Sequence, residues 1–174
     1  MSPISRPERS EYATYYGGYV DLVPEGDVLA QLRCLGVATL DLLESLDDVR
    51  AAHRYAPGKW SIKQLLGHVI DGERVFAHRA LAIARQDPAD QPSMEQDDWM
   101  AAVDFDRRSW ASLVAEYRAV RAATLALFES FDAETSLRRG RASGNPFTVR
   151  ALVYVVAGHE LHHLRVLRER YGVG

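Results

Sequence analysis

The sequence has little that would suit a disulfide-stabilised, membrane-embedded or nucleic-acid-binding protein. Cys34 is the single cysteine among 174 residues, which excludes an internal disulfide and suits a reducing compartment. No apolar run is long enough to span a bilayer, and residues 1–7 lack the apolar core of a signal peptide. The formal net charge is −3, so there is no basic excess for binding nucleic acid. We therefore expect a cytoplasmic protein whose partners are neither nucleic acids nor membranes.

Helical periodicity dominates the chain, and signals for β structure are missing. There are no alternating apolar and polar runs and no Asn-Gly hairpin turns. Apolar residues recur with a helical period in four segments, which predicts helices at residues 27–47, 61–86, 106–131 and 148–171. The predicted fold class is all-α: a single domain over residues 1–174, built as a four-helix bundle with an N-terminal arm over about residues 1–24.

Residues at the predicted helix starts support these bounds. Asp27 and Thr148 are candidate N-caps, and Ser61 with Gln64 matches a capping box. The basic cluster at residues 138–141 has no interleaved aromatic residues and is predicted to lie in a solvated turn. The connection at residues 87–105 is long for a compact domain, and such connections often lie over a site.

The last predicted helix has two apolar faces, although a surface helix of a monomer needs only one. The second face must be covered by the N-terminal arm or by another subunit. Its members are Val153, Ala157, Leu161 and Leu164. The arm carries tyrosines at helical spacing, which we expect to pack onto the core rather than to stack on a ligand. They are Tyr12, Tyr15, Tyr16 and Tyr19.

Three of the six histidines lie within residues 158–163, which read Gly-His-Glu-Leu-His-His. On a helix, His159 and His163 are one turn apart and project from the same side, a spacing at which two imidazoles can ligate one metal ion. The string is a literal H-E-x-x-H, but metalloproteases of that type take a third ligand from downstream. Glu169 is the only carboxylate there, and it lies roughly 240° around the helix, so the metalloprotease interpretation fails.

A third ligand must therefore come from upstream, and His68 is the best candidate. It lies in the middle of a helix on the buried face, whereas His53 lies in a loop and His78 lies among charged residues. Three histidines without a fourth protein ligand describe an open site. The alternative is a buried polar cluster that holds no metal.

The neighbouring polar residues have more open roles. His162 is about 60° off the inner face and is expected beside the site rather than as a ligand. Glu160, the catalytic candidate, is either the general base or the partner of a neighbouring cation. Glu73 is expected to pair with an arginine or with a histidine next to the site.

Four stretches of the chain together resemble the DinB/YfiT-like four-helix-bundle metalloproteins. They are residues 55–62 (Tyr-Ala-Pro-Gly-Lys-Trp-Ser-Ile), 67–74 (Gly-His-Val-Ile-Asp-Gly-Glu-Arg), 97–99 (Asp-Asp-Trp) and 158–163. The resemblance implies an up-down-down-up bundle with a long crossover connection, and frequent homodimers. It also implies a divalent ion held by three histidines, which match His68, His159 and His163.

The resemblance suggests two enzymatic functions in one pocket. We take a metal-dependent hydrolase-like enzyme as the working hypothesis, and transfer of a low-molecular-weight thiol to an electrophile as the alternative. A groove for the thiol would lie between the 87–105 connection and the arginines at 138–141. A third hypothesis is a stress-associated binding or scaffold protein without enzymatic activity. Three imidazoles suit zinc, nickel, iron or copper. We expect zinc or nickel, with iron or manganese as alternatives, and the expected partner is a small-molecule substrate.

Overall fold

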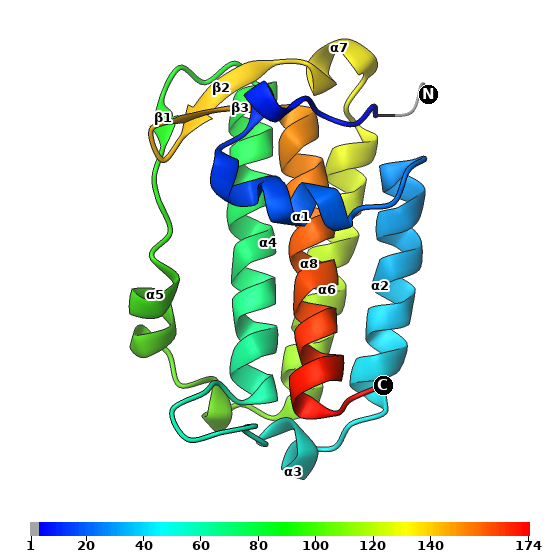
Figure 1. Cartoon of the computed structure of the whole chain (residues 1–174), viewed down its shortest axis with the longest axis vertical. Helices are drawn as coiled ribbons and strands as arrows, with labels where there is room; N and C mark the ends of the chain where they lie inside the picture. Colours follow the sequence, from blue (N-terminus) through cyan, green and yellow to red (C-terminus); the bar gives the residue numbers. More distant parts are fainter. Residues whose placement is uncertain (1–3) are drawn as a thin grey trace.

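Four long helices form the body of the protein, as a computed structural model that describes residues 4–174 shows. They are α2 (Val28–Glu44), α4 (Ile62–Ala84), α6 (Trp110–Glu129) and α8 (Val149–Tyr171). In Figure 1, α2 and α8 run opposite to α4 and α6, and the connection from α4 to α6 travels the whole length of the bundle. The predicted up-down-down-up bundle with a long crossover is confirmed.

The predicted caps explain why the helices begin where they do. The Asp27 carboxylate accepts hydrogen bonds from the backbone of Leu29 at 2.9 Å and of Ala30 at 3.2 Å. Ser61 and Gln64 form the reciprocal capping box at the start of α4. The start of α6 differs from the prediction, because residues 105–107 form a separate 3-10 turn and Ser109 provides the cap.

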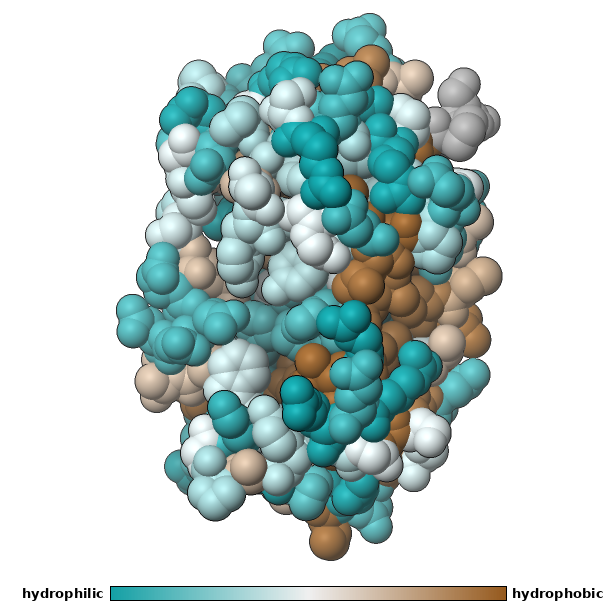
Figure 2. Space-filling view, viewed as in Figure 1, coloured by the Kyte–Doolittle hydropathy of each residue, from teal (hydrophilic) through white to brown (hydrophobic). Residues whose placement is uncertain are grey.

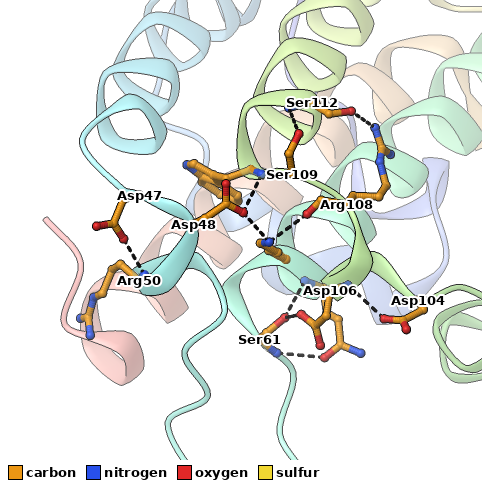
Figure 3. Close-up of polar contacts among 12 residues, drawn as sticks. Asp47, Asp48, Arg50, Ser61, Asp104, Asp106, Arg108, Ser109 and Ser112 are labelled. Carbon is orange, nitrogen blue, oxygen red and sulfur yellow. Dashed lines mark hydrogen bonds and ion pairs between the residues drawn. The ribbon is translucent and has the colours of Figure 1, made fainter.

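A polar network joins the starts of α4 and α6 at the lower end of the bundle (Figure 3). Asp48, in the short helix α3 (Asp48–Ala51), accepts from the Lys63 ammonium at 2.6 Å and from the Trp110 backbone at 3.0 Å. The Ser61 hydroxyl donates to Asp106 at 2.5 Å. These contacts fix the height at which α4 begins, and therefore the height of His68 within the bundle.

The N-terminal arm crosses the outer face of α8. It contains two 3-10 turns, Arg9–Glu11 and Thr14–Tyr16, and the helix α1 (Gly17–Leu22). The crossing is so close that a Cβ atom on Gly158 would lie 2.0 Å from the Tyr19 carbonyl oxygen. Glu11 fastens the arm by accepting from Thr148 at 2.8 Å and from the Arg150 guanidinium. The sequence predicted that the second apolar face of α8 is covered either by the N-terminal arm or by another subunit, and the structure shows the arm packed on α8.

The expectation of no β structure was wrong. Three short strands, β1 (Asp90–Gln91), β2 (Arg139–Ala142) and β3 (Asn145–Thr148), form a sheet in that order, with β1 parallel to β2. Strands of two to four residues are too short to show alternation. The hairpin turns at Ser143 and Gly144, which both have positive φ, as a two-residue hairpin turn requires.

The sheet also corrects the prediction of a solvated turn at residues 138–141, because β2 occupies most of that segment. Its pairing with β1 fastens the start of the long crossover to the β2–β3 hairpin. The crossover then continues past α4 and includes α5 (Gln96–Ala102), and the helix α7 (Ala133–Ser136) precedes β2. Within the described residues, no helix is both long and apolar enough to cross a membrane.

Candidate metal centre

Three histidine side chains converge between α4 and α8. His68 Nε2 lies 3.0 Å from His159 Nε2, and His163 Nε2 lies 3.1 Å from the same atom. His68 and His159 are each 5% exposed. All three ligand atoms lie within 4.8 Å of one another, so the structure brings the predicted trio together.

The donor set fits a bound cation better than it fits hydrogen bonding. His159 Nε2 carries either a hydrogen or a lone pair, and therefore cannot donate to one neighbour and accept from the other. A metal ion about 2.0 to 2.1 Å from each nitrogen would separate the nitrogens by about 2.8 to 3.4 Å in octahedral or tetrahedral geometry. The two separations around His159 fall within that interval.

Burial keeps these imidazoles neutral. Removal from water lowers the pKa of His68 from 6.5 to about 4 and that of His163 to about 3. The pKa of His159 is also held well below its usual value, first by burial and then by His163 and His68. At pH 7 each ring therefore has one unprotonated nitrogen, which metal ligation needs.

A glycine lets the two helices bring the trio together. Gly72 lies one turn after His68 on α4, where an added Cβ would lie 2.9 Å from His159 Cε1. A larger residue there would push the His159 ring away.

His68 and His159 line a cavity of about 360 Å³, which involves three parts of the chain besides α4 and α8. His163 lines a different pocket, of about 280 Å³. The N-terminal arm contributes tyrosines, including Tyr19, whose ring centroid lies 5.4 Å from that of His159. The crossover contributes residues 93–96, and the hairpin turn contributes Ser143. The expectation that the long connection lies over a site therefore agrees with the structure. The tyrosines were expected only to pack on the core, and they also line this cavity.

Glu160 lies in a buried network with partners from three other helices. Its carboxylate accepts from Thr39 at 2.7 Å, from the Arg121 guanidinium at 2.5 Å and from the Tyr117 hydroxyl. Arg121 also binds Glu73 through two hydrogen bonds, of 3.0 and 2.7 Å, which confirms the arginine partner predicted for Glu73. Both Glu160 oxygens are thus engaged by donors, as in the cation-pairing role.

The remaining histidines do not join the trio. His162 is half-buried, with its ring centroid 5.0 Å from that of His163 and 5.4 Å from that of Tyr19. His53 and His78 are exposed.

One residue of the cavity was missed by sequence reasoning. Arg79 follows His68 by eleven positions, or about 20° around the helix, so the two residues share a face of α4. That same-face spacing was the available signal.

Comparisons with known proteins agree with the four-helix fold. The sequence model of the DinB superfamily matches residues 31–167. Among solved structures, the chain is similar to YfiT from Bacillus subtilis, with a TM-score of 0.65 and 16% sequence identity. The likeness covers 98% of this chain and 95% of YfiT, which is described as a probable metal-dependent hydrolase with an unusual four-helix bundle topology. No curated protein matches the sequence.

Proposed function

The chain belongs to the DinB superfamily, and on that premise we propose that it is a metal-dependent hydrolase-like enzyme acting on a small molecule. His68, His159 and His163 hold the divalent ion, with zinc or nickel favoured by three imidazoles. The observation that carries the proposal is the convergence of three Nε2 atoms beside a cavity of about 360 Å³, which two of these histidines line. The description of YfiT as a probable metal-dependent hydrolase supports it.

A divalent ion at three imidazoles lowers the pKa of a water molecule or thiol and so supplies a nucleophile near neutral pH. The protein's own residues do the rest. The buried imidazoles stay neutral, and the Tyr19 ring packs edge-on against His159 and limits how that ring can turn. The cavity between the arm and the crossover accommodates the substrate.

For Glu160 we propose the pairing role rather than the general base. A base needs a free oxygen within hydrogen-bonding reach of the reacting group. Donors from Thr39, Tyr117 and Arg121 occupy its carboxylate, which is 2% exposed. We propose that Glu160 holds α8 in place and thereby positions His159, the preceding residue of the same helix.

The same observation favours thiol transfer as the second candidate function. Hydrolysis is faster when a base takes a proton from the attacking water, and Glu160 is not free to do so. A low-molecular-weight thiol ionises more readily than water and needs less help from a base. A purely structural or scaffold ion is less well supported, because structural ions have closed coordination shells and two of the three histidines line a cavity.

An activity screen with a matched pair of variants tests the proposal. Ester and amide hydrolysis and thiol-plus-electrophile transfer are assayed on purified protein, before and after chelation and after zinc or nickel is restored. We expect chelation and His68→Ala to abolish turnover while the circular dichroism spectrum stays helical. His78→Ala, an exposed histidine on the same helix, should retain turnover. Turnover that survives in His68→Ala would overturn the proposal, and a His68→Ala variant that unfolds would favour a structural ion.

We also propose that the protein is a cytoplasmic homodimer, with a second copy of the chain seated on an apolar groove between α2 and α8. This groove has a volume of about 290 Å³ and is lined by Pro24, Gln31, Cys34, Leu35, Ala38, Ala157 and Leu161. Figure 2 shows hydrophobic surface over this part of the bundle, next to the N-terminal arm.

A further inference from the structure

Arg79 is a buried cation without a buried counter-charge. Its side chain is on α4 and only 2% exposed. No carboxylate among residues 4–174 lies within 4.0 Å of its guanidinium nitrogens. Arginines are almost never fully buried unless they are paired, because an unpaired buried charge loses its hydration without compensation. Such a residue therefore indicates a ligand that supplies the negative charge.

The hydrogen bonds of Arg79 leave part of its guanidinium free. Nη2 donates to the Pro92 carbonyl at 2.6 Å and to the Ser143 hydroxyl at 3.3 Å. Nε is buried and has no hydrogen-bond partner in the described part of the chain. A guanidinium presents its N–H groups as a planar fork that matches two oxygens of one anion. Of the nitrogens of this guanidinium, only Nη2 has hydrogen-bond partners among the described residues, so Nε and Nη1 remain for an anion.

The position of Arg79 links this fork to the metal centre. Arg79 lines the same cavity as His68 and His159. Its guanidinium carbon lies 5.8 Å from the centre of the Phe76 ring, and that ring centre lies 5.6 Å from the His159 ring. One small molecule can therefore contact Arg79 together with His68 and His159, with its apolar middle against Phe76.

We propose that Arg79 binds the anionic end of the substrate, a carboxylate or similar small oxyanion, whose reacting group lies at the histidine trio. The position of the reacting group rests on the proposed function, whereas the anion site does not. The one carboxylate that lines the cavity, Glu95, is exposed and beyond ion-pairing distance of Arg79.

Three related probes separate the two parts of the proposal: 6-mercaptohexanoate, its neutral amide, and 6-hydroxyhexanoate. Binding to zinc-loaded protein is measured by NMR titration. A charge-assisted hydrogen bond strengthens binding about tenfold to a hundredfold. We therefore expect the carboxylate to bind at least about tenfold more tightly than the amide, and this advantage should disappear in Arg79→Gln. In the matched variant Arg74→Gln, which changes an exposed arginine of the same helix, the advantage should remain.

An equal affinity of wild-type protein for the carboxylate and the amide would overturn the anion site, as would an advantage that survives in Arg79→Gln. Should Arg79→Gln fail to fold, the Arg79 Nε–H resonance of wild-type protein provides the test. This resonance should shift when either carboxylate probe is added and should not shift with the amide. A resonance that does not shift with the carboxylates, or that shifts equally with the amide, would refute the proposal. The thiol and the alcohol differ only at the reacting end. If the metal centre is wrong, their affinities become equal while the carboxylate advantage remains.

Discussion

Replacing Arg121 by methionine should destabilise the bundle more than any surface change to the same helix. Arg121 is 3% exposed, and it is the only hydrogen-bond donor to Glu73 among residues 4–174. Without it, two buried carboxylates, Glu73 and Glu160, face each other with no cation between them. Removing one partner of a buried ion pair costs about 3 to 5 kcal/mol, which for a chain of this size lowers the melting temperature on the order of 10 °C.

Urea unfolding followed by circular dichroism measures this loss. Arg118→Met is the matched control, because Arg118 lies on the same helix and pairs with Glu44 on the surface; it should cost less than about 1 kcal/mol. Adding Glu73→Met to Arg121→Met removes one stranded carboxylate and should recover about 2 kcal/mol. If Arg121→Met cost no more than Arg118→Met, or if the second substitution made the loss larger, the buried charge network would not have the role assigned here.

Three further predictions concern the arm and the apolar groove. The hydrogen bond from Arg150 holds the pKa of Glu11 below its usual value of 4.5. The ionised Glu11 carboxylate therefore contributes fully to the free energy of unfolding above pH 4.5, and its contribution is lost as the pH falls through the lower pKa of the folded state. Glu11→Gln should make the free energy of unfolding depend less on pH in the acid range. Gly158→Ala should displace the arm, seen as faster proteolysis near Tyr19 with the helix content kept, and an unchanged cleavage rate would contradict the close crossing. Ala38→Glu should convert the proposed dimer to monomer in sedimentation velocity, whereas wild-type protein that sediments as a monomer would remove the dimer.

The long helices could be predicted because their signals are local. Apolar periodicity and the caps at Asp27, Ser61 and Thr148 lie within a few residues of the ends that they define. The histidine trio could also be predicted, since a bundle brings the inner faces of two helices together at similar heights.

The parts that could not be predicted depend on contacts between distant segments. The sheet forms because β1 of the crossover pairs with a hairpin about fifty residues later, and neither has enough residues to show a strand pattern. The role of Glu160 was left open between general base and partner of a cation, because the sequence does not reveal that Arg121 reaches it from another helix. The tyrosines of the arm were assigned to the core because their second contact, the cavity wall, is created only when the crossover lies opposite them.

The amount of metal that the protein binds tests the central claim most directly. Untagged protein is purified, analysed for its elements and, after chelation, titrated with zinc and with nickel. The account predicts close to one ion per chain for wild-type protein and for His78→Ala, and a large loss of affinity in His68→Ala and His163→Ala with the fold intact. Wild-type protein that takes up neither metal, or His68→Ala that binds as tightly as wild type, would contradict it.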